Sequence, residues 1–177
     1  MNQIREAMPS DRDAIEAIYR DAFPGTEWRA VARVALDLLE TPAATGCFAL
    51  LAESDGAVAG HVAFSPVCIA GYRDWRGFIL APLAVRAAEQ GRGLGSRLVR
   101  TGLDRLSDQG AQRVFVYGDP GYYGRFGFSA DAAGGFRAPY PLEYAFGWQG
   151  LVLGDGESPD EEVGISCVEA LNDPGLW

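Results

Sequence analysis

The residues best suited to chemistry form a glycine-rich run, Gln90-Gly91-Arg92-Gly93-Leu94-Gly95-Ser96. It lies between an apolar stretch, Phe78 to Val85, and a stretch whose apolar residues recur at helical spacing. The start of a helix offers backbone N–H groups without helical partners and the positive end of the helix dipole, so it binds phosphate without a lysine. Glycines let an anion approach closely, and Arg92 and Arg97 add positive charge. The run therefore predicts a pyrophosphate-binding loop.

Two other interpretations of this loop are weaker. In the dinucleotide fingerprint GxGxxG counted from Gly91, the third glycine would fall at position 96, which is Ser96. That fingerprint also follows the first strand of a parallel sheet, whereas this loop follows an expected antiparallel hairpin. A tight turn without a ligand explains the glycines but not the arginines.

The motifs around this loop resemble those of a known family. Leu83-Ala84-Val85 followed by Gln90-x-x-Gly93-x-Gly95 resembles the acyl-CoA-binding motif of the GNAT superfamily of N-acetyltransferases. Tyr123-x-x-x-Gly127-Phe128 resembles its next motif, and the whole segment 118–128 resembles a bacterial subgroup of predicted acetyltransferases. The resemblance implies that the backbone of Leu83, Ala84 and Val85 pairs with the pantetheine arm of acetyl-CoA. It also implies that the amides of residues 91–96 hold the pyrophosphate.

Acyl transfer from a thioester to an amine needs a proton for the departing thiolate. Tyr123 stands where the resemblance places the general acid, and a phenol with a pKa near ~10 can protonate the thiolate at neutral pH. Tyr122 is its rival, because one residue of register error would exchange the two. Packing of this aromatic pair in the core is the structural alternative. The carbonyl would be polarised by the backbone N–H of Val85 or Ala84.

The general base is not identified. Many family members carry a glutamate in the strand before the loop, but Phe78 to Val85 has no acidic residue. His61, Asp119 and water are the alternatives, although His61 could be structural and Asp119, before a proline, could start a turn. Glu27 and Trp28 fall in a region that resembles the substrate-side loop of the family, where an acid could receive an amine. A helix N-terminal charge that faces solvent explains Glu27 equally well.

Composition excludes several kinds of site. All 15 basic residues are arginine, so a P-loop lysine and a Schiff-base lysine are impossible. His61 is the single histidine and the three cysteines are far apart, which implies no metal and no disulfide framework. The net charge of −9 argues against nucleic acid and anionic membranes as partners. No apolar run approaches roughly 20 residues, and no signal peptide is evident, so we expect a soluble, cytoplasmic protein.

The elements expected around these residues alternate between strand and helix. A short strand precedes two helices, and Pro9, Ser10 and Asp13 predict the start of the first in a Ser-x-x-acid pattern. A hairpin of two strands follows, residues 47–53 and 57–68, which turns at Ser54-Asp55-Gly56. The strand at Phe78 to Val85, the helix after the loop and the strand at Val114 to Tyr117 require parallel pairing. Two further strands follow, 148–153 and 163–168. We therefore expect one α/β domain over residues 1–177, a GNAT-like fold whose central mixed sheet is flanked by helices.

Three functions are consistent with these features. The first is an N-acetyltransferase that transfers an acetyl group from acetyl-CoA to a primary amine of a small molecule or protein. The second is a non-catalytic acyl-CoA-binding or sensing module, because the strand acid is missing. The third, an NAD-dependent oxidoreductase, depends on glycine spacing alone. The acceptor and the oligomeric state stay open, although a homodimer is common among relatives.

Overall fold

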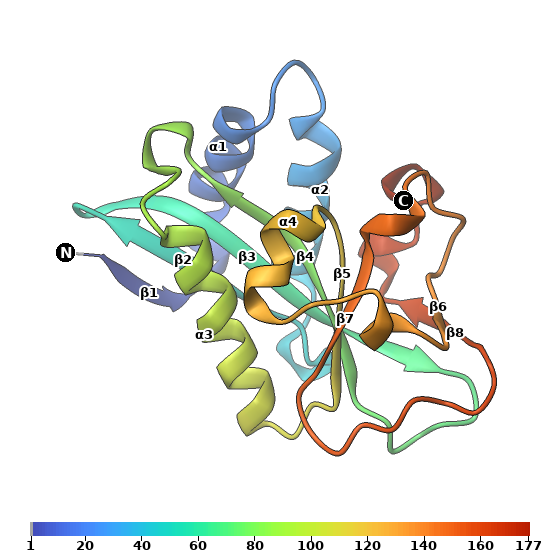
Figure 1. Cartoon of the computed structure of the whole chain (residues 1–177). Helices are drawn as coiled ribbons and strands as arrows, with labels where there is room; N and C mark the ends of the chain where they lie inside the picture. Colours follow the sequence, from blue (N-terminus) through green and yellow to red (C-terminus); the bar gives the residue numbers. More distant parts are fainter. Residues whose placement is uncertain (1) are drawn as a thin grey trace. The chain divides into compact units, whose positions relative to one another are not determined.

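The computed structural model describes residues 2–177 (Figure 1). The chain divides into two compact units, each built from two segments. The first contains the chain up to Phe64 together with Ala81–Leu103, and the second contains Ser65–Leu80 together with Asp104–Trp177. The third and fourth strands and the third helix contribute residues to both units, so each unit is described by itself.

The first unit begins as the sequence predicts, with a strand and two helices. Its elements, some of which continue into the second unit, are β1 (Gln3–Glu6), α1 (Arg12–Ala22), α2 (Trp28–Glu40), β2 (Phe48–Ser54), β3 (Ala57–Ile69), β4 (Gly77–Val85) and α3 (Leu94–Asp108). β2 pairs antiparallel with both β1 and β3. The predicted hairpin turn is confirmed, since Asp55 and Gly56 both have positive φ angles, 51° and 80°.

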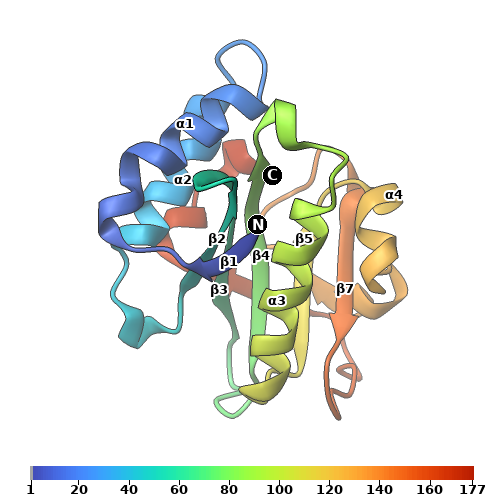
Figure 2. The ribbon, with the colours of Figure 1, turned by 90° about the vertical axis from the view of Figure 1, so that its left-hand side faces the viewer.

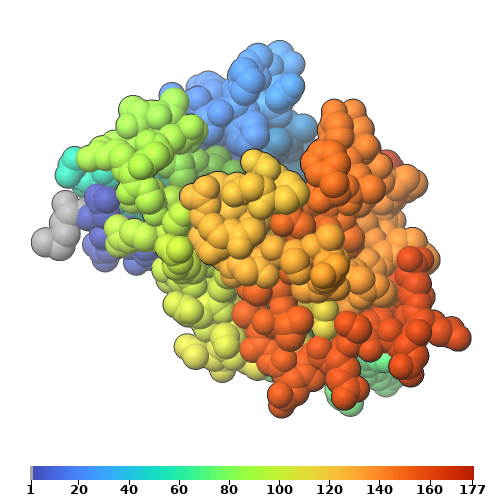
Figure 3. All heavy atoms as spheres, in the orientation of Figure 1, coloured from blue at the N-terminus to red at the C-terminus, as the bar shows by residue number. Residues whose placement is uncertain are grey.

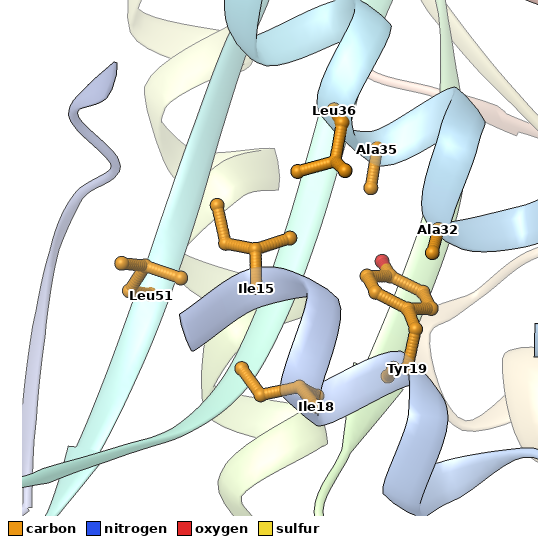
Figure 4. Close-up of a cluster of buried hydrophobic side chains, with 8 residues drawn as sticks. Ile15, Ile18, Tyr19, Ala32, Ala35, Leu36 and Leu51 are labelled. Carbon is orange, nitrogen blue, oxygen red and sulfur yellow. The ribbon is translucent and has the colours of Figure 1, made fainter. Parts of the chain in front are cut away.

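The core of the first unit lies between its helices and β2. α1 and α2 lie side by side (Figure 2), and their apolar faces meet because both helices carry apolar residues at helical spacing. Figure 4 shows the buried side chains that fill this layer, namely Ile15, Ile18, Tyr19, Ala32, Ala35, Leu36 and Leu51. All of them are 7% exposed or less.

The second unit contains the parallel pair. Its further elements are β5 (Arg113–Tyr117), α4 (Pro120–Tyr123), β6 (Phe136–Arg137), β7 (Trp148–Val152) and β8 (Val163–Cys167). β5 pairs parallel with β4 over Gly77–Ile79 and antiparallel with β7. Parallel and antiparallel pairs therefore occur together, which confirms the predicted mixed sheet.

Aromatic rings fill the centre of the second unit. The rings of Phe115 and Trp148 stack with centroids 5.1 Å apart, and Phe136 meets Phe115 edge-on at 5.2 Å. The buried guanidinium of Arg113 lies over the Phe136 ring, 4.7 Å from its centroid. It donates through Nη2 to the carbonyl of Gly156 at 2.7 Å and through Nη1 to the carbonyl of Ala132. Arg113 thereby ties two loops to β5.

Two details differ from the sequence-based expectation. α1 does not begin at a Ser10 cap, because a 3₁₀ turn over Pro9–Asp11 precedes it and the Asp11 carboxylate accepts from the Met8 amide at 2.8 Å. β6, which pairs parallel with β8, was not expected at all. In the part of the chain that the structure describes, no helix is long and apolar enough to cross a membrane.

Candidate active site

The glycine-rich loop has the backbone conformation that phosphate binding requires. Gly91 and Gly93 have φ angles of 73° and 81°, a region that side-chain-bearing residues rarely adopt. α3 begins immediately afterwards at Leu94, and the amide of Arg97 is hydrogen-bonded to the Gly93 carbonyl at 3.0 Å. The amides of residues 94–96 therefore precede the first helical hydrogen bond and have no partner inside the helix. Amides of this kind are what the predicted pyrophosphate-binding loop needs.

Contacts with other elements of the first unit hold the strand end and the loop. The Arg86 amide donates to the Ala59 carbonyl on β3 at 2.8 Å, and its Nε donates to the Val58 carbonyl at 2.9 Å. The Asp21 carboxylate on α1 accepts from the Ala87 amide at 2.6 Å. The chain therefore leaves β4 along a fixed path before it reaches Gly91.

Gln90 closes the loop onto the strand before it. Its side-chain amide donates to the carbonyl of Val85 at 3.0 Å. Sequence reasoning placed Gln90 among the cofactor-binding residues, and in this structure its side chain braces β4. The loop is also tied to β2, since the Glu89 carboxylate accepts from the Ser54 hydroxyl at 3.0 Å and pairs with Arg92 at 2.8 Å.

Close packing sets α3 against β3. A Cβ on Gly102 would lie 2.1 Å from the Phe64 ring, and one on Gly60 would lie 3.0 Å from Leu98. Gly102 leaves no room for a methyl group beside the Phe64 ring and Gly60 leaves little beside Leu98, because helix and strand approach closely. The helix N-terminus is thereby fixed in position, which favours a preorganised phosphate site.

The second unit carries Tyr123 at the end of the short helix α4. The Asp119 carboxylate caps this helix by accepting from the Gly121 amide at 2.8 Å, which confirms the expected turn. The Tyr123 ring lies against the backbone of Gly118, where a Cβ would come within 2.6 Å of the ring. It meets Tyr122 edge-on at 5.0 Å. Burial, with a smaller contribution from Tyr122, raises the pKa of Tyr123 above its ordinary value, so the phenol keeps its proton.

Tyr122 has a different environment. The Arg125 guanidinium lies over its ring, 4.5 Å from the centroid, and the Arg125 Nε donates to the Tyr122 carbonyl at 3.0 Å. Tyr122 thus has a packing role on α4, and so does Tyr123, whose ring also meets Phe128 edge-on at 5.9 Å.

His61 is a buried structural residue in this structure. Its side chain is fully buried, and its Nδ1 lies 2.7 Å from the Tyr19 hydroxyl. Desolvation lowers the pKa of His61 to about 3. Nε2 has no hydrogen-bond partner among the described residues. A neutral imidazole that binds a proton this weakly is a poor base, so His61 is set aside for that role.

Two arginine side chains lie beside Trp28, in the region that resembles the substrate-side loop of the family. The guanidinium groups of Arg20 and Arg29 lie 5.0 Å and 5.2 Å from the centroid of the Trp28 ring. Arg20 is paired with the Glu16 carboxylate at 2.5 Å, whereas Arg29 places a positive charge beside this ring, where it would repel a cationic amine.

The chain belongs to the acetyltransferase (GNAT) family, whose model matches residues 12–128. The fold is accordingly the mixed α/β fold expected from the motifs. No grouping of histidine, cysteine, aspartate and glutamate suited to a metal occurs among residues 2–177.

Relatives and solved structures support the same assignment. The chain is 41% identical over 145 residues to the uncharacterized N-acetyltransferase YhbS of Escherichia coli (strain K12), covering 81% of this chain and 83% of the relative. It is 44% identical over 107 residues to the uncharacterized N-acetyltransferase YjhQ of the same organism. That match covers 59% of this chain and 59% of the relative.

Two solved structures of the family contain the cofactor. The crystal structure of E. coli YhbS in complex with CoA has a TM-score of 0.83, 34% identity and coverage of 97% of this chain and 92% of that chain. The structure of a Brucella melitensis family member with acetyl-CoA has a TM-score of 0.69, 30% identity and coverage of 96% and 97%.

Proposed function

We propose that this chain is a single-domain N-acetyltransferase that transfers the acetyl group of acetyl-CoA to a primary amine, with Tyr123 as the general acid. The observation that carries the proposal is the loop before α3. Its two glycines with positive φ lead directly into helix amides that have no partner inside the helix. Family membership and the relatives' complexes with CoA and acetyl-CoA support the same ligand.

The cofactor is held mainly by backbone groups. The amides of residues 91–96 bind the pyrophosphate, and the backbone of Leu83, Ala84 and Val85 pairs with the two amides of the pantetheine arm. Because the chain has no lysine, the charged support comes from arginine. Arg92 is already paired with Glu89, so the amides supply most of the specificity.

In the reaction the amine nitrogen attacks the thioester carbonyl carbon and the C–S bond breaks. The electron pair of that bond stays on sulfur, and Tyr123 supplies the proton that makes the free thiol of CoA. The resulting phenolate takes a proton back from solvent. A backbone N–H of Ala84 or Val85 stabilises the negative charge that develops on the carbonyl oxygen. The attacking nitrogen loses a proton to water, because His61 binds protons too weakly to take it.

The test is acetyl-CoA turnover against a panel of primary amines, with acetylated product detected by mass spectrometry. Mass spectrometry is preferable to a thiol reagent because Cys68 is exposed and would react. Tyr123→Phe should lower kcat about 100-fold with little change in the KM for acetyl-CoA, since the hydroxyl acts only on the leaving group. Tyr122→Phe is the matched control. Equal activity of Tyr123→Phe and the wild type would remove Tyr123 from the mechanism.

A non-catalytic acyl-CoA-binding or sensing module is the second candidate. It is favoured by β4, which has no acidic residue, and by the burial of His61, since together they leave no side chain assigned as base. This alternative predicts that acetyl-CoA binds and that no amine in the panel is acetylated. A homodimer and a cytoplasmic location stay predictions.

A further inference from the structure

A cavity of about 480 Å³ opens in the second unit beside the end of β5. It lies between the turn after β5, the segment around Glu143 and the last residues of the chain. Figure 3 shows the first two of these, the gold residues near 120 and the orange residues near 145, at the surface of one face. The aromatic and acidic residues that line the cavity are Tyr117, Asp119, Glu143, Tyr144, Phe146 and Trp177.

The aromatic walls of this cavity are held in place. The Trp177 ring stacks on Tyr117 with centroids 6.2 Å apart, and its indole N–H donates to the Leu171 carbonyl at 3.2 Å. The Tyr117 hydroxyl accepts from the Tyr144 amide at 2.9 Å. By contrast, the side chains of Tyr144 and Phe146 are 54% and 67% exposed at the rim. Exposed aromatic rings beside a cavity are typical of ligand sites.

The charge of the cavity is entirely negative. Asp119 and Glu143 both line it, and no arginine or histidine is present among the described residues of its lining. Glu143 accepts a hydrogen bond from the Tyr144 hydroxyl, which raises the pKa of that phenol. Carboxylates among aromatic faces attract organic cations, through direct charge attraction and through the negative faces of the rings. The Trp28 region, flanked by two arginines, has the opposite character.

The cavity is connected to the proposed acid through a single residue. Gly118 lines the cavity, and its backbone is packed against the Tyr123 ring. Asp119 then caps the helix that carries Tyr123. A molecule bound in this cavity is therefore close to α4.

The carboxylates do not favour the reacting nitrogen itself. Nearby negative charge raises the pKa of an amine and keeps it protonated, whereas attack on the thioester needs the neutral amine. Asp119 and Glu143 are better suited to a positive charge that takes no part in the reaction. We propose that the acceptor carries a second cationic centre besides its primary amine, and that this cavity binds that centre. The proposal rests on the acetyltransferase function proposed above.

Binding can be tested without acetyl transfer by using choline and 3,3-dimethylbutan-1-ol, which share a shape and differ in charge. The probe signal is the indole N–H of Trp177 in an NMR titration, assigned with Trp177→Phe. We expect choline to bind at least about tenfold more tightly than the alcohol. The double variant Asp119→Asn, Glu143→Gln should remove that preference, since both amides keep the hydrogen-bonding shape while losing charge. Glu157→Gln, which changes an exposed acid outside the cavity, should retain it.

The aromatic contribution is tested separately with Phe146→Leu. This rim residue is mostly exposed, so its replacement leaves the fold intact. We expect choline to bind about threefold more weakly while the neutral alcohol is unaffected, because leucine keeps apolar contact and loses the aromatic face. Equal affinity of choline and the alcohol for the wild type, or no effect of the double variant, would overturn the cationic site.

Turnover then separates this proposal from the function on which it rests. With acetyl-CoA, (5-aminopentyl)trimethylammonium should have a KM at least about tenfold below that of pentylamine, and the double variant should abolish the difference. Acetylation of both amines with equal KM would overturn the cationic site and leave the acetyltransferase function standing. Choline binding without acetylation of any amine would overturn the function and with it the acceptor role of the cavity.

Discussion

At the scale of single residues, burial favours the neutral form of both His61 and Tyr123. It lowers the pKa of the imidazole and raises that of the phenol, because desolvation penalises whichever form carries the charge. The two consequences differ for catalysis. The phenol keeps the proton that an acid must donate, whereas the imidazole loses the affinity for a proton that a base needs.

The lowered pKa of His61 can be tested directly, because His61 is the single histidine of the chain. We expect its imidazole proton signals in an NMR titration to stay constant from about pH 8 to about pH 5, because the pKa of His61 lies near 3. A midpoint near the ordinary value of 6.5 would show instead that the side chain reaches solvent.

The free energy of unfolding should depend on the ionisation of His61. In the unfolded chain the imidazole ionises below its ordinary pKa of 6.5, while in the folded chain it stays neutral down to about 3. The contribution of His61 to the free energy of unfolding is therefore present above pH 6.5 and is lost as the pH falls toward 3. The loss is on the order of a few kcal/mol. Urea unfolding at several pH values measures this loss, and His61→Gln should have a shallower dependence on pH in that range.

The raised pKa of Tyr123 predicts the shape of the pH–rate profile. Because its pKa is raised, the phenol is protonated throughout the range below about pH 10, and the rate should rise with pH only as the amine loses its proton. Measurements of kcat/KM for the amine from about pH 6 to about pH 10 should therefore show no descending limb. Tyr122→Phe should have the same profile. A descending limb with a midpoint near pH 8 would assign the acid to another group.

The sequence identified residue types better than residue environments. It singled out Tyr123 and His61 as side chains that can carry a proton, but their burial depends on elements distant in the chain. Tyr19, which approaches His61 to 2.7 Å, is 42 residues away and carries no local signal of that contact. The cavity that contains Glu143 and Trp177 has the same origin, since its walls come from three separate segments.

At the scale of elements, the loop before α3 depends on two glycines whose φ angles are positive. Gly93→Ala should lower the free energy of unfolding by about 1 kcal/mol, because alanine is strained at a φ of 81°. It should also weaken acetyl-CoA binding about tenfold, since the strained loop turns its amides away from the phosphates. Urea unfolding and isothermal titration calorimetry measure the two effects.

The matched control for this substitution is Gly124→Ala. Gly124 has a helical φ of −56°, and a Cβ there would meet nothing within 4 Å. Alanine should therefore leave stability unchanged or raise it by a few tenths of a kcal/mol. If Gly93→Ala behaved like this control in both measurements, the loop would not depend on its left-handed glycine.

Most elements could be predicted from the sequence because their patterns are local. The hairpin around Asp55 and Gly56 and the strand, loop and helix from β4 to α3 are all marked by apolar runs with turn residues between them. β6 could not be predicted, because two residues carry no periodicity and its pairing with β8 joins segments far apart in the chain. The start of α1 was misplaced because Asp11, rather than Ser10, accepts from the backbone at that turn.

At the scale of the whole chain, the protein must bind an anionic cofactor although its own net charge is −9. A negative net charge gives no overall attraction for an anion, so local backbone amides and arginines have to supply the affinity. The proposed binding mode predicts selectivity, because it places a pyrophosphate on the amides and requires a pantetheine arm that pairs with a strand. NAD has the pyrophosphate but lacks that arm.

Ligand-dependent stability tests this selectivity on the intact chain. A ligand that binds only the folded state at about 100 times its Kd raises the free energy of unfolding by about 2.7 kcal/mol. For a chain of this size that corresponds to a rise in Tm of about 5–10 °C. We expect acetyl-CoA and CoA to produce this shift in a thermal melt and NAD at equal concentration to produce none. The Gly93→Ala variant should need about tenfold more acetyl-CoA for the same shift, whereas Gly124→Ala should match the wild type. A shift with NAD and none with acetyl-CoA would mean that the loop binds a dinucleotide, and the assignment of Leu83 to Val85 as the pantetheine strand would fall with it.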